Sequence, residues 1–269
     1  MKGVGLVHNL RQKEYGQQEL QIKLEELNRS NMELEEFAYV ASHDLQEPLR
    51  KLSTFGERLR NRCGDQLSEE GITYLNRMMA SAESMRVLID NLLEFSRVTR
   101  NQHPFTREDL GVLVKNVVDE LDLSIEDTHA SVLVDPLPVV EIMPLQIRQV
   151  FSNLISNALK FRRNDIVPEI RITASRLSSE EQEILKLRSS YPYYRITVAD
   201  NGIGFEEIYA ERIFQLFQRL HGKTEYPGSG IGLAICRKIM DNHQGLIMAE
   251  SHTGQGASFS IILPEKQFS

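Results

Sequence analysis

The stretch FAYVASHDLQEPLRKL, residues 37–52, places a histidine and an aspartate side by side among apolar residues that recur at helical spacing. A heptad assignment with Ala41 at d and Leu45 at a puts His43 at position f, which faces away from the apolar seam. The periodicity that predicts a helix therefore argues against a histidine packed in the core.

The neighbours of His43 bear on what its imidazole could do. A zinc site needs a second ligand one turn away, and Gln46 and Glu47 stand there instead of another histidine. Asp44 could keep one ring nitrogen protonated and leave the other free as a nucleophile. Pro48 removes a backbone donor and would bend the helix. This stretch alone leaves open a reactive histidine or a solvated surface histidine.

The apolar seam begins well before residue 37. It comprises Leu20, Leu24, Leu27, Leu34, Ala38, Ala41, Leu45 and Leu52, and Asn31 is a polar residue on the same stripe. Such a pattern is typical of a coiled coil in which one polar a position sets the register. It predicts an N-terminal coiled-coil or linker helix over residues 1–36.

A second helical pattern runs from Ile72 to Ser96, after a break at Gly64. Ser68 is placed to cap the second helix. Two amphipathic helices with a short connection predict an antiparallel hairpin over residues 37–103. Because a lone hairpin cannot enclose a core, we expect two copies to form a four-helix bundle in a homodimer.

The pattern changes after Pro104. Helical periodicity over 109–127 and 144–161 alternates with strand-like segments such as PEIRITASRL and YYRITVAD. The mixture predicts an α+β fold for residues 104–269, an α/β sandwich with helices on one face of a sheet.

Composition narrows the class of protein. The 269 residues are 41% apolar and carry a formal net charge of -7, which argues against a nucleic-acid binder. No apolar run reaches the roughly 20 residues that a transmembrane helix needs. Cys63 and Cys236 lack metal-ligand spacing and fit a reducing compartment. The sequence predicts a cytoplasmic protein without a transmembrane segment.

Polar residues share one face of the helix predicted in NLISNALKF. Asn153, Asn157 and Lys160 are spaced i, i+4 and i+7. Amide oxygens suit a hard cation, and a lysine offers a point charge to phosphate. The spacing predicts a face that could bind a metal and phosphate groups.

Two glycine-rich segments follow. In ADNGIGF, Asp200 ends a strand, where its carboxylate could accept from an exocyclic amine while backbone approaches a flat ligand. In PGSGIGLAI, a loop enters a helix, and such an end binds phosphate on its N–H groups. Each glycine cluster alone could be a tight turn, but three polar clusters in this order within one domain are much stronger evidence for a binding site together than each is alone. The glycines are Gly202, Gly204, Gly228, Gly230 and Gly232.

Taken in order, these motifs resemble those of the sensor histidine kinases of two-component systems. SHDLQEPLR is similar to the H box, NLISNALKF to the N box, DNGIGF to the first glycine box, IFQLFQRL to the phenylalanine box and GSGIGLAI to the second glycine box. The resemblance extends from about residue 36 to TGQGASFSIILP. The sequences FAYVASHDLQEPLR, around the histidine, and LFQRLH are similar to those of kinases attached to phytochrome-like or PAS sensors.

The resemblance implies a reaction and its partners. ATP with Mg²⁺ would bind the C-terminal domain, and the γ-phosphoryl group would move to His43, with Asp44 orienting or deprotonating it. The phosphoryl group would pass next to an aspartate of a response-regulator receiver domain. The homodimer would receive its signal from a sensor domain or protein for which residues 1–36 leave no room.

It also implies roles for residues of the C-terminal half. Asn157 would hold Mg²⁺, Asn153 and Lys160 would contact phosphates, and Asp200 would accept from the adenine amino group. The five glycines would shape the pocket. Residues 218–227 would form a mobile lid, from which Arg219 could reach the phosphate.

Two further residues of the phenylalanine box, Phe214 and Phe217, are expected mainly to pack in the core. Glu47 departs from the family pattern, because kinases with strong phosphatase activity carry Thr or Asn there. A carboxylate at that position would repel an acyl phosphate.

Two rival classes are weaker. A hydrolysing ATPase of the gyrase and chaperone type would carry a glutamate one turn before the metal-binding asparagine, where this chain has Asn153. A catalytically silent dimeric scaffold would not need the polar residues of every box.

Overall fold

The computed structural model describes residues 21–23, 26, 29, 40, 42, 44–188, 191–220, 226 and 229–267, apart from 101–103 and the side chains of 97–100. These residues fall into two compact units, divided between Ser96 and Arg97. His43, Gly228 and most of the expected coiled coil lie outside the described residues. Within the described part of the chain, no helix is both long and apolar enough to span a bilayer.

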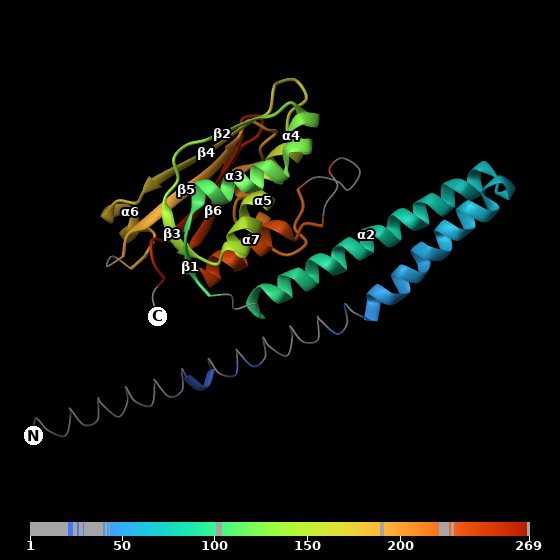
Figure 1. The fold of residues 1–269 in the computed structure, drawn as a ribbon, viewed down its shortest axis with the longest axis horizontal. Coiled ribbons are helices and arrows are strands. Elements are labelled where there is room, and N and C mark those ends of the chain that lie inside the picture. Colours follow the sequence, from blue (N-terminus) through green and yellow to red (C-terminus); the bar gives the residue numbers. More distant parts are fainter. Residues whose placement is uncertain are drawn as a thin grey trace, which may run out of the picture. The chain divides into compact units, whose positions relative to one another are not determined.

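The first unit contains a helical hairpin (Figure 1). Residues 44–63 are helical through Pro48, a short 3₁₀ turn follows at η1 (Gly64–Gln66), and α2 spans Glu69–Arg100. Ser68 accepts a hydrogen bond from the Gly71 N–H at 3.1 Å, so the predicted cap of the second helix is present.

Small residues let the two helices of the hairpin approach closely. A Cβ on Gly56 would lie 2.9 Å from Met79 Cγ, so a larger residue at position 56 would displace the Met79 side chain. The apolar interior between the helices contains Leu49, Leu75, Ala82 and Leu93, each less than 9% exposed. The predicted hairpin therefore folds around a thin apolar seam.

The second unit combines a sheet with helices. Its elements are β1 (Thr106–Asp109), α3 (Leu110–Glu120), α4 (Asp122–Thr128), β2 (Ser131–Val134), β3 (Val139–Ile142), α5 (Pro144–Lys160), β4 (Glu169–Arg176), α6 (Ser179–Ile184), β5 (Tyr193–Asp200), η2 (Glu207–Tyr209), η3 (Arg212–Phe214), α7 (Gly232–Asn242), β6 (Leu246–His252) and β7 (Gly256–Pro264).

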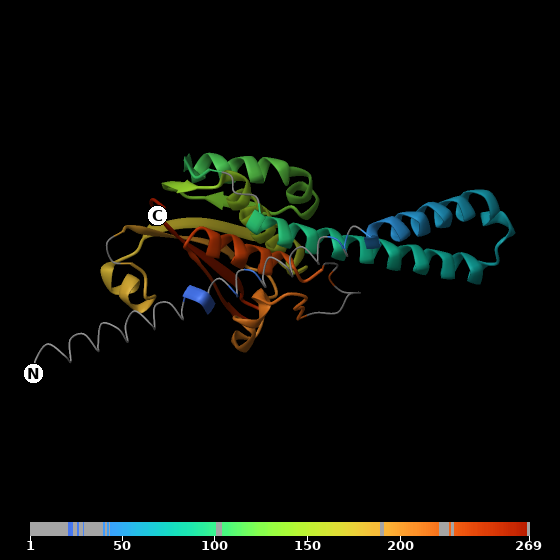
Figure 2. The same ribbon diagram turned by 90° about the horizontal axis from the view of Figure 1, so that it is seen from below.

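Five strands form the main sheet in the order β2-β4-β5-β7-β6, and β1 pairs with β3 separately. Among the strands that the structure describes, β2 and β4 of the main sheet pair in parallel, and the other neighbours in this sheet are antiparallel. Helices α3, α5 and α7 pack against one another and cover one face (Figure 1). Helix α6 lies on the side of the sheet opposite α3 (Figure 2).

The core of this unit lies between the sheet and the helix layer. It includes Ile147, Phe151, Leu154, Ile155, Ile196, Val198, Ile235 and Ile239, each at most 2% exposed. On α5, burying one apolar face leaves the opposite face for polar residues. The predicted α+β architecture, helices over one face of a sheet, is confirmed, and the core holds α5 and α7 as the supports of the candidate site.

Candidate nucleotide site

Helix α5 carries the three polar residues expected on one face. Asn153 and Asn157 are half-buried, and neither carboxamide has a hydrogen-bond partner among the described residues. A Cβ on Gly232, the first residue of α7, would lie 2.9 Å from Asn153 Oδ1. The asparagine face of α5 therefore adjoins the N-terminus of α7.

Asp200 lies at the end of β5 with its carboxylate held by backbone. Its Oδ1 accepts from the Gly202 N–H at 2.8 Å and from the Ala257 N–H at 3.2 Å. Burial raises the pKa of Asp200, and these two bonds oppose the rise. Because both bonds end on Oδ1, the other oxygen can accept from an exocyclic amino group.

Close backbone contacts shape the loop after Asp200. A Cβ on Gly202 would lie 2.4 Å from the Phe161 carbonyl oxygen, and Ile203 donates to that same oxygen at 2.9 Å. Gly204 has φ +62°, and a Cβ there would lie 2.3 Å from the His252 carbonyl oxygen. The loop is therefore fastened to the C-terminal end of α5, directly beside Lys160.

Positive charge collects near the same end of α5. Burial lowers the pKa of Lys160, and the nearby positive charge of Arg219 lowers it further. Arg219 Nη2 donates to the Tyr226 carbonyl at 2.7 Å, and the Tyr226 ring packs on Phe161 at 5.1 Å between centroids. Two cations that raise each other's energy favour binding of an anion between them.

The N-terminus of α7 adds a second anion-binding feature. Ile231 at its N-cap position makes no side-chain capping bond within the described residues. Gly230, just before, has φ +74°, and a Cβ there would lie 2.8 Å from the Gln218 carbonyl oxygen. The first N–H groups of α7 are thus available to phosphate oxygens.

The expectation for Phe217 is wrong. Phe214 is 3% exposed, so it packs in the core as expected. The Arg237 guanidinium lies 4.4 Å from its ring centroid, within the range of a cation–π contact. Phe217 is 55% exposed and has φ +62°, which is unusual for a bulky residue. It follows η3 in irregular backbone, so spacing along the chain did not place it inside.

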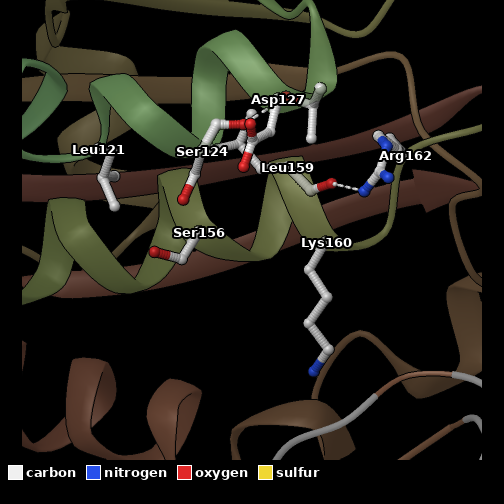
Figure 3. Close-up of a pocket in the computed structure, with 8 residues that line it drawn as sticks. Leu121, Ser124, Asp127, Ser156, Leu159, Lys160 and Arg162 are labelled. Atoms are coloured by element: carbon white, nitrogen blue, oxygen red, sulfur yellow. Dashed lines mark hydrogen bonds between the residues drawn. The ribbon is translucent and has the colours of Figure 1, made fainter.

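A pocket of about 270 Å³ lies between α4 and the C-terminal half of α5 (Figure 3). It is lined by Leu121, Ser124, Asp127, Thr128, Ser156, Leu159, Lys160 and Arg162. In Figure 3 the Lys160 ammonium is directed away from the other lining residues. Neither Asn153, Asn157 nor Asp200 lines this pocket, which shares Lys160 with the site predicted from sequence.

The structure therefore places Asn153, Asn157, Lys160, Asp200, Gly202, Gly204, Arg219, Gly230 and Gly232 around α5 and the start of α7. Sequence reasoning missed Ala257, which contributes only a backbone N–H and so has no side-chain signal. It also missed Tyr226, because its ring contact with Phe161 joins segments that are far apart in the sequence. Asp44 is exposed in the hairpin.

Comparisons with known proteins match both units. The His Kinase A phospho-acceptor domain matches residues 33–101, and the histidine kinase-, DNA gyrase B- and HSP90-like ATPase matches residues 143–267. ShkA, solved at full length in complex with AMPPNP, has a TM-score of 0.62 over 87% of this chain and 47% of that chain. At 22% identity this likeness supports the fold alone.

Curated relatives match most of this chain at higher identity. Cyanobacterial phytochrome A of Nostoc sp. is 39% identical over 89% of this chain and 29% of its own length. Phytochrome-like protein Cph1 of Synechocystis sp. is 37% identical over 88% of this chain and 30% of its own length. Sensor protein kinase WalK of Staphylococcus saprophyticus is 30% identical over 86% of this chain and 37% of its own length.

The second unit is thus a nucleotide-binding domain of the class shared by histidine kinases, gyrase and Hsp90. With the phospho-acceptor domain before it, the chain belongs to the sensor histidine kinases and resembles their phytochrome-type members. It spans 29% to 37% of the length of the three curated relatives named above.

Proposed function

We propose that this chain is an ATP-dependent protein-histidine kinase that phosphorylates His43. The observation that carries the proposal is that a carboxylate-bearing loop and two cationic side chains meet at one end of a helix. At the C-terminal end of α5, the loop of Asp200 is held against Phe161, while Lys160 and Arg219 bring two positive charges together. A carboxylate for an amino-purine and cations for a polyphosphate fit ATP.

The reaction breaks the bond between the γ-phosphorus and the bridging oxygen of ATP. A ring nitrogen of His43 forms the new P–N bond, ADP leaves, and the imidazole proton goes to a base. Asp44, next in the chain, is proposed to orient His43 or take this proton. The protein's main contribution is to position the groups and neutralise charge.

Asn157 is proposed to hold Mg²⁺. Its half-buried carboxamide oxygen is the type of ligand that Mg²⁺ accepts together with waters and substrate phosphates. The ion would neutralise charge on the phosphates. Asn153 and Lys160 are proposed to bind phosphate oxygens, and Asp200 to accept from the adenine amino group.

The chain is proposed to work as a homodimer joined through the hairpin. Heptad-spaced apolar side chains face solvent on both helices, at 43% to 65% exposure: Leu45, Leu52, Phe55 and Leu59 on the first, and Tyr74, Met78 and Met85 on α2. Packing two such faces together would form a four-helix bundle and remove this surface from water.

The phosphoryl group is proposed to pass from His43 to an aspartate of a receiver domain. An upstream sensor, on this protein or another, would set the rate. Glu47 forms an exposed ion pair with Lys51 at 2.7 Å, so the fourth position after His43 carries a carboxylate. We therefore expect little phosphatase activity towards the phosphorylated receiver.

The test uses ATP labelled at the γ-phosphate. We expect label on the protein that survives alkali, is lost in acid and is abolished by His43→Gln. His129→Gln, which changes an exposed histidine of the nucleotide-binding unit, is the matched control. Steady phosphate release without labelled protein would indicate a hydrolysing ATPase. Neither label nor release, with intact nucleotide binding, would indicate a scaffold.

A further inference from the structure

Ser251 on β6 is a buried polar residue to which the proposed chemistry assigns no part. It is 4% exposed, and its hydroxyl donates to the Gly256 carbonyl oxygen at 2.7 Å. The Ser251 hydroxyl oxygen also accepts a hydrogen bond from the Phe205 N–H at 2.9 Å. The hydroxyl therefore joins the loop after Asp200 to the start of β7.

The partner carbonyl leads directly to the carboxylate. The carbonyl of Gly256 and the N–H of Ala257 belong to one peptide group, and that N–H donates to Asp200 Oδ1 at 3.2 Å. Because a peptide group is planar, fixing the direction of its carbonyl also fixes the direction of its N–H. Ser251 and Asp200 are thus hydrogen-bonded to opposite sides of one rigid unit.

Packing holds this peptide close to β5. Gly256 has φ +91°, and a Cβ there would lie 1.9 Å from the Asp200 carbonyl oxygen. Glycine permits the approach but does not by itself fix the rotation of the peptide. The hydroxyl of Ser251 supplies a directional bond, and linked hydrogen bonds polarise and strengthen one another.

We propose that Ser251 is a positioning residue for recognition of the 6-amino group of adenine. Through the Gly256–Ala257 peptide it keeps Oδ1 of Asp200 occupied by a backbone N–H, so that Oδ2 faces the amino group of the purine. Through Phe205 it holds the loop that follows Asp200. This proposal rests on the proposed function, because it assigns a residue to the same nucleotide site.

The experiment compares two nucleotides on the full chain. Calorimetry with Mg²⁺ gives the dissociation constants of ATP and of purine riboside triphosphate, which lacks the 6-amino group. Their ratio measures how much the amino group contributes to binding. The ratio is the dissociation constant of purine riboside triphosphate divided by that of ATP. A general loosening of the domain would weaken the binding of both nucleotides alike and leave this ratio unchanged. A misdirected Asp200 carboxylate would weaken ATP binding more and lower the ratio.

Ser251→Ala is the test variant, and Ser251→Thr keeps the hydroxyl. Ser260→Ala is the matched control, because it removes a part-buried hydroxyl of the same sheet that bonds to Thr197 at 2.9 Å. Ser251→Cys keeps a side chain of similar shape with a weaker hydrogen-bond donor, and it replaces Ser251→Ala as the test variant if the alanine variant does not fold.

We expect Ser251→Ala to lower the preference for ATP about fivefold, with Ser251→Thr and Ser260→Ala within about twofold of the parent. An unchanged ratio in Ser251→Ala, with or without weaker binding of both nucleotides, would overturn the positioning role and leave the kinase proposal intact. A parent chain that binds neither nucleotide would overturn the proposed function itself.

Discussion

His243, at the C-terminal end of α7, joins three segments of the nucleotide-binding unit. Its ring is fully buried, Nε2 accepts from the Met143 N–H at 3.0 Å, and Nδ1 donates to the Ile239 carbonyl at 2.7 Å. The Phe105 ring makes an edge-to-face contact with it, at 5.3 Å between ring centroids. An imidazole that accepts at one nitrogen and donates at the other has to be neutral.

This arrangement predicts a pH dependence of stability. Burial lowers the pKa of His243, so the unfolded chain takes up a proton that the folded chain excludes. The free energy of unfolding is unaffected by protonation of this histidine above its pKa in the unfolded chain, about 6.5. Below that pH the free energy of unfolding falls, by at most about 1.4 kcal/mol per pH unit. Urea unfolding of this unit at pH 7.5 and 5.5 measures the loss.

His243→Gln provides the comparison, because an amide can donate and accept without titrating in this range. We expect the variant to be less stable at pH 7.5 but to lose less stability on going to pH 5.5. An equal loss in both proteins would show that other groups cause the dependence.

Asp200 allows a prediction about binding. Asp200→Asn keeps the size of the side chain, but its Oδ1 is already needed by two N–H groups, so an NH₂ group would face the adenine amine. We expect ATP affinity to fall at least about tenfold without loss of helical content by circular dichroism. Asp165→Asn, an exposed carboxylate paired with Arg163, should leave ATP affinity unchanged.

At the scale of elements, helices α5 and α7 approach so closely at Gly232 that one added methyl group would contact the Asn153 carboxamide. Gly232→Ala would place a Cβ 2.9 Å from Asn153 Oδ1, and the carboxamide can move away more easily than backbone. Alanine has the higher helix propensity, so the melting temperature should not fall. We expect ATP affinity to fall several-fold in calorimetry.

Gly64→Ala is the control for this variant, because a Cβ there meets nothing within 4 Å. Equal ATP affinity in Gly232→Ala and the parent would argue against a role for the position of Asn153. A lower melting temperature in Gly232→Ala alone would show that the substitution disturbs packing instead.

Elements with strong periodicity could be predicted from sequence. The helix expected over 144–161 is present as Pro144–Lys160, and the break at Gly64 followed by the Ser68 cap is where the hairpin turns. The turn chemistry and the 3.6-residue period determine these features locally. The predicted division between residues 103 and 104 stays a prediction.

Features that depend on irregular backbone could not be predicted. Phe217 is exposed because the chain leaves 3₁₀ geometry after Phe214, and no spacing signals a left-handed residue. Ala257 and Ser251 act through a peptide group that reaches Asp200 only once β6 and β7 are paired. Side-chain motifs therefore pointed to the residues that are proposed to face the ligand and missed the backbone and hydroxyl groups that contact them.

At the scale of the whole molecule, the exposed apolar faces of the hairpin predict association. Leu52→Glu combined with Met78→Glu would place a charge on each helix face, where burial against a second copy would be costly. We expect the parent to sediment as a dimer and this double variant as a monomer at micromolar concentration, by analytical ultracentrifugation.

Ile184→Glu is the matched control, because Ile184 is 78% exposed on α6 of the other unit. It should leave the mass unchanged. A monomeric parent, or a dimeric double variant, would contradict assembly through these faces.

The strand order has a consequence for synthesis on the ribosome. β7 is inserted between β5 and β6, and among the described strands β6 is the edge strand that pairs with β7. A nascent chain can complete the hairpin from local contacts, but its sheet stays open until β7 leaves the exit tunnel. At about 5–20 residues per second, the emerging hairpin has several seconds to meet another copy before its own domain can capture nucleotide.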